Sequence, residues 1–151
     1  MKVSKEMIKS FLSAPSIAIA GVSRDPKKFG YAVLKELKQK GLNVIPVNPE
    51  ADLILDTPCY RDIRTLPDSI GHLLIVTPKS ATLGVLKEAE QKGIRNIWIQ
   101  QHSDTPEALE FARNSNMNLI HGKCILMFSE PVVSLHKFHR NILKFFGRLP
   151  K

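Results

Sequence analysis

The chain has 151 residues, of which 43% are hydrophobic, so it can bury the core of one domain and is not intrinsically disordered. No apolar run approaches the roughly 20 residues that span a membrane, and the first residues lack the pattern of a secretory signal peptide. Cys59 and Cys124 lie too far apart for a zinc knuckle or a CxxC redox pair. We therefore expect a cytoplasmic protein with reduced cysteines.

The formal net charge of +8 suggests a polyanionic partner, but the charge is concentrated at the two ends of the chain. Residues 1–14 carry a net charge of +2, and residues 134–151 contain five basic and no acidic side chains. The residues between them contain 14 basic and 13 acidic side chains and are almost neutral. The net charge is therefore a poor indicator of a nucleic-acid partner.

Short apolar runs alternate with helical patterns along the chain. The runs are typical of strands buried on both faces of a parallel sheet, and they cover residues 16–21, 43–47, 72–76, 96–99 and 118–120. Helices are expected over about residues 4–12, 30–40, 80–92, 105–114 and 133–147, and a short helix near 62–66. We place helix caps at Ser80 and Asp104 and helix ends at Lys40-Gly41 and Lys92-Gly93.

Strands and helices that alternate at this spacing predict an α/β fold. We expect a Rossmann-like three-layer sandwich, in which a five-stranded, mainly parallel sheet has helices on both faces. The whole chain is predicted to form a single domain with a core over about residues 14–130. In such folds ligands bind beyond the carboxyl ends of the strands, so the loops that leave the strands decide the function.

The loop after the first strand, residues 21–30, is the strongest candidate for a phosphate site. A glycine at each end permits a tight turn and a close approach to a ligand, and the following helix offers free N–H groups. Arg24, Lys27 and Lys28 add cations, although neither GxGxxG nor GxxxxGK[ST] is present. The alternative is an ordinary loop solvated by its lysines.

The loops after the next two strands add further polar groups. Asn48 and Pro49 occupy the place where dinucleotide-binding folds carry an acidic residue for the ribose, and Glu50 comes one position late. Lys79 follows the third strand and is expected to meet a second phosphate. A simple Asn-Pro turn and a helix start at Ser80 are the structural alternatives.

Several of these stretches together resemble the CoA-binding domain family. That family comprises small stand-alone Rossmann-like proteins, and it is related to the CoA-binding domains of the succinyl-CoA synthetase alpha subunit and of acyl-CoA synthetases. The matching stretches are IAIAGVS at 17–23, VIPVNP at 44–49, Cys59-Tyr60, VTPK at 76–79, WIQ at 98–100 and GKC at 122–124. Val-Asn-Pro combined with the downstream Cys-Tyr is the most specific part.

The resemblance implies that CoA is held across the carboxyl edge of the sheet. The first loop would hold the pyrophosphate, the second would lie near the adenosine, and the third would border the pantetheine arm or a phosphate. The implied cofactor-binding residues are Gly21, Val22, Ser23, Lys28, Phe29, Gly30, Asn48, Pro49, Tyr60, Thr77, Pro78, Lys79, Gln100 and Cys124. The last two lie further along the cleft.

The sequence indicates a binding protein for CoA or an acyl-CoA rather than an enzyme. No histidine is paired with an obvious carboxylate, and Cys124 has no visible base, so we assign neither catalytic residues nor metal ligands. An NAD(P)-binding enzyme or sensor on the same fold is the first alternative, although the glycine fingerprint is missing. A nucleic-acid-binding protein is the second, although no RNP-type motif is present.

The C-terminal residues carry an apolar stripe at helical spacing. Leu135, Phe138, Ile142, Phe145 and Leu149 make up this stripe, and the basic side chains lie away from it. We expect this helix, over about residues 133–147, to dock on the sheet of its own chain. A homodimer contact is the next alternative, and an interfacial membrane helix is the least favoured.

Overall fold

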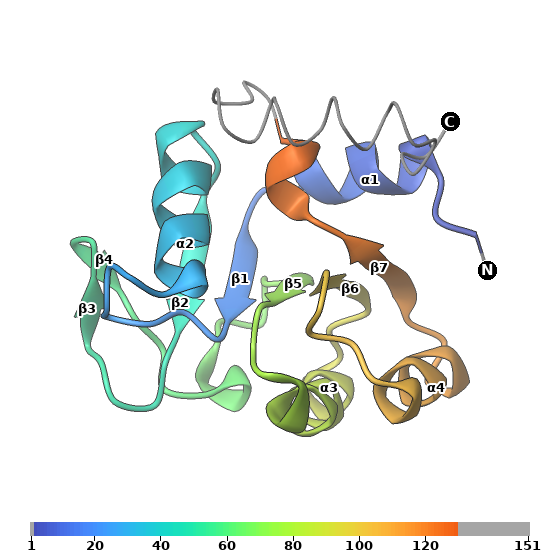
Figure 1. Cartoon of the computed structure of the whole chain (residues 1–151). Helices are drawn as coiled ribbons and strands as arrows, with labels where there is room; N and C mark the ends of the chain where they lie inside the picture. Colours follow the sequence, from blue (N-terminus) through green and yellow to red (C-terminus); the bar gives the residue numbers. More distant parts are fainter. Residues whose placement is uncertain (1, 130–151) are drawn as a thin grey trace.

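The computed structural model describes residues 2–129, which fold around one parallel sheet (Figure 1). The strands are β1 (Ile17–Ala20), β2 (Val44–Val47), β5 (His72–Ile75), β6 (Asn96–Gln100) and β7 (Asn118–Lys123), in the order β2-β1-β5-β6-β7. All four neighbouring pairs are parallel. The chain moves outward from β1 to β2 and then crosses to β5 on the other side of β1, so the strand order reverses between β1 and β5.

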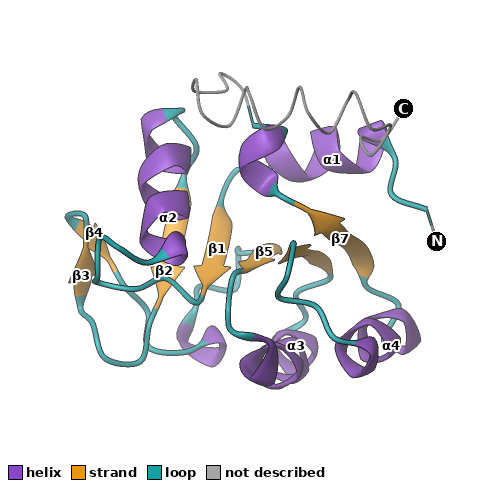
Figure 2. Cartoon of the chain, viewed as in Figure 1, coloured by secondary structure: helices purple, strands orange, loops and turns teal. Residues whose placement is uncertain are grey.

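Helices cover both faces of the sheet, which confirms the predicted three-layer α/β fold (Figure 2). The helices α1 (Lys5–Leu12) and α2 (Phe29–Gln39) lie on one face, and α3 (Lys79–Lys92) and α4 (Pro106–Asn114) lie on the other. Each predicted strand within the described residues is present. Among residues 2–129, no helix has the length and apolar content to cross a membrane.

The hydrophobic core forms two layers because alternate residues of each strand point to opposite faces of the sheet. Ile17 and Ile19 pack with α1 and α2, whereas Ala18 and Ala20 pack with the layer that contains α3 and α4. All four residues of β1 are buried. This burial on both faces explains why the strand reads as a continuous apolar run.

Two predicted helix caps are wrong. Thr105, not Asp104, caps α4, and its hydroxyl accepts a hydrogen bond from the Ala108 N–H at 3.1 Å. The reason is that Pro106 disfavours a helical backbone at the residue before it, which makes Thr105 the extended cap. The helix α3 begins directly after Pro78, so Ser80 lies inside its first turn instead of capping it.

The segment between β2 and β5 contains more order than the sequence indicated. It holds a two-stranded hairpin, β3 (Leu53–Ile54) and β4 (Thr57–Pro58), and the predicted short helix as a 3-10 turn, η1 (Ile63–Thr65). The hairpin turn places Leu55 and Asp56 at left-handed φ values. This pair lacks the Asn-Gly or Asp-Gly sequence that marks such turns. A second 3-10 turn, η2 (Ile125–Met127), follows β7. The helix predicted over about residues 133–147 lies outside the described residues.

Candidate functional site

The candidate site begins where β1 ends, at the reversal of strand order. Gly21 follows β1 with a left-handed φ of +98°. A Cβ atom built on it would lie 2.7 Å from the backbone nitrogen of Thr77, which follows β5. Only glycine combines this conformation with so close an approach, so Gly21 allows the chain to leave β1 directly beside the end of β5.

Gly30 lies in the first turn of α2 and faces the same stretch of backbone. A Cβ atom on it would lie 2.4 Å from the carbonyl oxygen of Gly21 and 3.1 Å from the Cα atom of Val22. The helix therefore starts in direct contact with the junction of strand and loop. Glycine has the same close-packing role in dinucleotide-binding folds, although this chain lacks their glycine spacing.

The N-termini of α2 and α3 differ from those of the other two helices. Within residues 2–129, no side chain caps α2, which follows Lys28, or α3, which follows Pro78. By contrast, Ser4 caps α1 and Thr105 caps α4, and both of those helices also carry a glutamate in the first turn. The first turns of α2 and α3 contain no acidic residue. Both ends therefore keep N–H groups and a positive dipole that suit an anion.

The loop between β1 and α2 is folded on itself. The Asp25 N–H donates to the Ser23 hydroxyl at 3.0 Å, and the Lys27 N–H donates to the Asp25 carboxylate at 2.9 Å. The side chains of Lys27 and Lys28 remain exposed, and Phe29 is 47% exposed, which is unusual for so large an apolar side chain. The loop thus presents three cations to solvent, since Arg24 is also exposed and lies 3.8 Å from the Glu50 carboxylate, together with an aromatic ring.

Asn48 joins the loop after β2 to the loop after β1. Its side-chain N–H donates to the carbonyl of Val22 at 2.7 Å, and its side-chain oxygen accepts from the Glu50 N–H at 2.7 Å. The side chain therefore holds the two loops against each other.

Tyr60 lies beside Asn48 although it is far from it in sequence. Its backbone N–H donates to the Pro46 carbonyl at 3.0 Å, and its carbonyl accepts from the Asn48 N–H at 2.9 Å. These bonds add Tyr60 to the edge of β2 as a parallel bridge opposite Val47. The side chain is half-buried, and Pro49 next to Asn48 is exposed. The Val-Asn-Pro and Cys-Tyr stretches therefore meet at one corner of the sheet.

Thr77 connects the loop after β5 to the loop after β6. Its buried hydroxyl lies 2.9 Å from the hydroxyl of Thr82 on α3, which donates to the Ser103 carbonyl at 2.7 Å. Pro78 and Lys79 follow on the exposed rim. Our sequence prediction missed Thr82 and Ser103. The available signal was that Thr82 occupies a core position of α3 together with Leu86 and Ala89.

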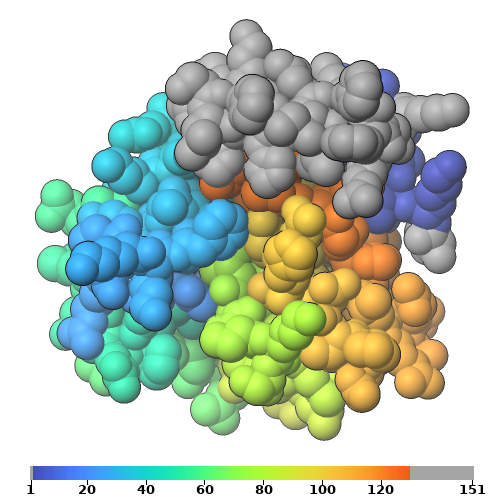
Figure 3. All heavy atoms as spheres, viewed as in Figure 1, coloured from blue at the N-terminus to red at the C-terminus, as the bar shows by residue number. Residues whose placement is uncertain are grey.

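The loops after β1, β5 and β6 gather on one face, where they appear in blue, yellow-green and yellow (Figure 3). An open groove of about 720 Å³ runs from Lys79 along the start of α4. Its lining residues are Lys79, Asp104, Thr105, Pro106, Leu109, Glu110 and Arg113. The carboxyl edge is thus hollowed next to the N-terminus of α3.

Gln100 and Cys124 lie away from the reversal of strand order, at the ends of β6 and β7. The side-chain oxygen of Gln100 accepts from the Ile125 N–H at 3.1 Å, and the side chain is almost completely buried. Cys124 is also buried, and this burial raises the pKa of its thiol above the usual value. Both side chains face the interior of the protein, where they stabilise the turn that follows β7.

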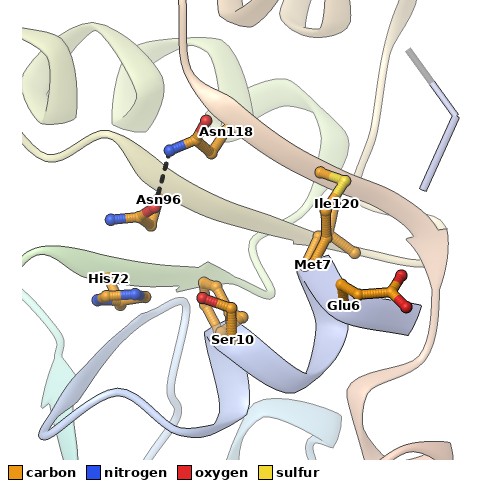
Figure 4. A pocket seen from close by; sticks show the side chains of 8 residues that line it. Glu6, Met7, Ser10, His72, Asn96, Asn118 and Ile120 are labelled. Carbon is orange, nitrogen blue, oxygen red and sulfur yellow. Dashed lines mark hydrogen bonds between the residues drawn. The ribbon is translucent and has the colours of Figure 1, made fainter. Parts of the chain in front are cut away.

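A separate pocket of about 330 Å³ lies at the opposite, amino edge of the sheet (Figure 4). It is formed by α1 and by the first residues of β5, β6 and β7. There the Asn118 side chain donates to Asn96 at 3.0 Å, and the His72 ring packs edge-on against Phe11 with 5.4 Å between ring centres. Burial lowers the pKa of His72. His72 therefore packs against α1 at the start of β5.

The sequence model of the CoA-binding domain matches residues 15–130. The chain belongs to the CoA-binding domain family. This match spans β1 to β7, and it contains both glycines and both uncapped helices of the candidate site.

Relatives of this CoA-binding domain include both large and small proteins. The chain is 29% identical over 130 residues to the alpha subunit of ADP-forming acetate–CoA ligase II from Pyrococcus furiosus, covering 79% of this chain and 28% of that subunit. It is 26% identical to the uncharacterized protein YneT from Bacillus subtilis, covering 81% of this chain and 91% of YneT. A solved structure of a conserved hypothetical protein from Pyrococcus furiosus is 36% identical, with a TM-score of 0.71, and the match covers 73% of this chain and 95% of that one.

Proposed function

We propose that this CoA-binding domain protein binds CoA or an acyl-CoA at the carboxyl edge of its sheet and catalyses no reaction of its own. One observation carries the proposal. The helices α2 and α3 begin on either side of the strand-order reversal, and both N-termini lack a side-chain cap and an acidic first turn. Two neighbouring anion-binding helix ends suit a ligand with several phosphates, and CoA carries a pyrophosphate and a 3′-phosphate.

The pyrophosphate is assigned to the N-terminus of α2. The glycine contact between Gly21 and Gly30 removes the side chains that would keep a phosphate away from the backbone. Lys28 lies at the cap position of this helix, and its exposed ammonium is free to approach a phosphate oxygen. Lys79 is the first residue of α3, one position inside the second helix end, and it is also exposed. We assign Lys79 to the second anionic group.

The adenosine is assigned to the corner where Pro49 and Tyr60 meet. Pro49 is exposed, and Tyr60 offers a half-buried ring at the edge of β2. Phe29 lies where the phosphate loop meets α2, and its exposed ring provides further apolar surface. In this assignment Asn48 acts through the loops it joins and does not bind the ligand itself.

The residues of the site favour binding over catalysis. Backbone N–H groups and lysine ammonium groups hold anions, but they provide no nucleophile. The Cys124 thiol is buried with a raised pKa, which keeps it protonated and unreactive. The chain spans 28% of the length of the acetate–CoA ligase alpha subunit, so we propose for it only the binding step.

Isothermal titration calorimetry with CoA, dephospho-CoA, NAD and ATP tests this function. We expect CoA to bind more tightly than the other three ligands, because it alone combines a pyrophosphate, a 3′-phosphate and a pantetheine arm. Equal affinity for all four ligands, or binding of none, would disprove the proposal.

The lysine assignments require matched variants. Lys28→Gln and Lys79→Gln should each weaken CoA binding by about fivefold, the loss of one modest charge-assisted contact. Lys35→Gln on α2 and Lys87→Gln on α3 remove the same charge about two turns further along each helix and should leave binding nearly unchanged. A variant that loses more affinity for CoA than for dephospho-CoA identifies the lysine at the 3′-phosphate.

A further inference from the structure

The turn that follows β6 holds a histidine in an unfavourable backbone conformation. The Ser103 N–H donates to the Gln100 carbonyl at 2.9 Å, which closes a tight turn around the two residues between them. His102 in this turn has a φ of +75°, a value typical of glycine. The His102 side chain is exposed, so packing in the core does not account for a residue other than glycine at this position.

Both ends of this turn are fixed by hydrogen bonds to the rest of the fold. The Gln101 N–H donates to the Lys123 carbonyl at 3.2 Å, and the Gln100 side chain accepts from the Ile125 N–H at 3.1 Å. On the other side, the Ser103 carbonyl accepts from the hydroxyl of Thr82. The turn therefore presents His102 at the carboxyl edge from a well-anchored loop.

The location of the turn relates it to the proposed phosphate sites. The hydroxyls of Thr77 and Thr82 connect it to the loop that carries Lys79. In the sheet, β6 lies one strand beyond β5 and two strands beyond β1. Since neighbouring strands are about 4.8 Å apart, the ends of these three strands lie close together. If the phosphates of a ligand lie at the N-termini of α2 and α3, the portion of the ligand beyond its phosphates can reach the turn that contains His102.

We propose that His102 contacts the pantetheine arm of CoA and makes the site select CoA over its nucleotide portion. This inference rests on the proposed CoA binding. The pantetheine arm carries two amide groups, and an imidazole offers both a donor and an acceptor nitrogen for them in its neutral form. His102 would then be a specificity-determining residue at a position where glycine would be more stable.

The test compares His102→Gly with Asn116→Gly. Asn116 also has a positive φ, of 55°, but it lies between α4 and the start of β7, at the amino edge of the sheet. Both substitutions should raise the melting temperature, because glycine adopts these conformations without steric cost. Only His102→Gly should weaken CoA binding, by about three- to tenfold for one lost hydrogen bond. Its affinity for adenosine 3′,5′-bisphosphate, which lacks the arm, should not change.

The outcomes separate this contact from the function on which it rests. If the unmodified chain binds CoA and His102→Gly binds it equally well, the contact is wrong and the proposed function stands. An equal loss of affinity for CoA and for adenosine 3′,5′-bisphosphate also overturns the contact with the arm. If the unmodified chain binds neither ligand, the proposed function fails and the contact fails with it.

Discussion

Gly30 and Gly21 touch so closely that a Cβ atom on Gly30 would lie 2.4 Å from the Gly21 carbonyl oxygen. The contact brings the first turn of α2 against the end of β1, where the backbone cannot easily move because Gly21 itself abuts Thr77. The predicted phosphate loop is therefore shaped from both ends by backbone-to-backbone packing. A side chain at Gly30 would push α2 away from the strand-order reversal, and one at Gly21 would collide with the backbone that follows β5.

Gly30→Ala should lower the free energy of unfolding by about 1–3 kcal/mol, because the added methyl group overpacks a backbone contact. Gly84→Ala is the matched control, since Gly84 lies in α3 and a Cβ there has no neighbour within 4 Å. That control should stabilise the protein by up to about 1 kcal/mol through helix propensity. Urea unfolding measures both. If Gly30→Ala is as stable as the unmodified chain, the contact is looser than described.

The buried hydroxyl of Thr82 should contribute to stability through the loops that it joins. Thr82→Val keeps the shape of the side chain but leaves the Ser103 carbonyl and the Thr77 hydroxyl without this partner. We expect a loss of about 1–3 kcal/mol in the free energy of unfolding, the cost of a buried polar group without its hydrogen bond.

Thr82→Ser provides the control for this pair of contacts. It retains the hydroxyl and removes one methyl group, so it should cost only about 1 kcal/mol. Chemical denaturation of the two variants distinguishes the roles of hydroxyl and methyl. A larger loss for Thr82→Ser than for Thr82→Val would show that packing, not hydrogen bonding, explains the burial of Thr82.

The sequence predicted most of the fold because the strands of a parallel sheet are apolar on both faces and read as short continuous runs. It also predicted the loop with Gly21 and Gly30, since glycines after a first buried strand have a direct physical role. It did not predict the contact between Thr82 and Ser103, because a polar pair 21 residues apart leaves no local pattern. Predicting contacts of this kind requires the packing of α3 against the loops.

Asn48 shows a second limit of local patterns. Its place at the end of β2 suggested a ligand contact, yet its side-chain amide is engaged by the Val22 carbonyl and the Glu50 N–H. A sequence indicates which polar groups lie at an edge, but it does not show which of them are already hydrogen-bonded to neighbouring loops. The Asn48 contacts thus link the loop after β2 to the loop after β1.

The corrected cap of α4 leads to a simple stability test. Thr105→Ala should lower the free energy of unfolding by about 1 kcal/mol, because the Ala108 N–H loses its side-chain partner. Asp104→Ala, one residue earlier, removes no capping contact and should have a smaller effect. Thermal unfolding followed by circular dichroism compares them. The assignment is wrong if Asp104→Ala is the more destabilised variant.

Two half-buried histidines should make the protein less stable in mild acid. Burial lowers the pKa of His72, and burial together with Arg113 lowers the pKa of His121. The unfolded chain therefore takes up protons more readily than the folded chain as the pH falls below about 6.5, the ordinary pKa of histidine. Stability is retained above that pH and declines below it.

The variant His72→Gln/His121→Gln tests this pH dependence. Its melting temperature should change less between about pH 7.5 and pH 5.5 than that of the unmodified chain, because two groups that favour the unfolded state in acid are gone. Measurements stop above the range where carboxylates titrate, so acidic residues contribute little. Parallel pH profiles for the two proteins would rule out these histidines as the cause.

The two cysteines should differ in their reactivity toward a thiol reagent. Burial raises the pKa of both thiols, so the reactive thiolate is scarce at about pH 8, and Cys124 is the more deeply buried of the two. We expect Cys59 to react slowly in the folded protein and Cys124 to react only after unfolding. Absorbance kinetics with a disulfide reagent, on Cys59→Ser and Cys124→Ser separately, assign each rate. Rapid modification of folded Cys59→Ser would show that the turn after β7 opens readily and that Cys124 is accessible there.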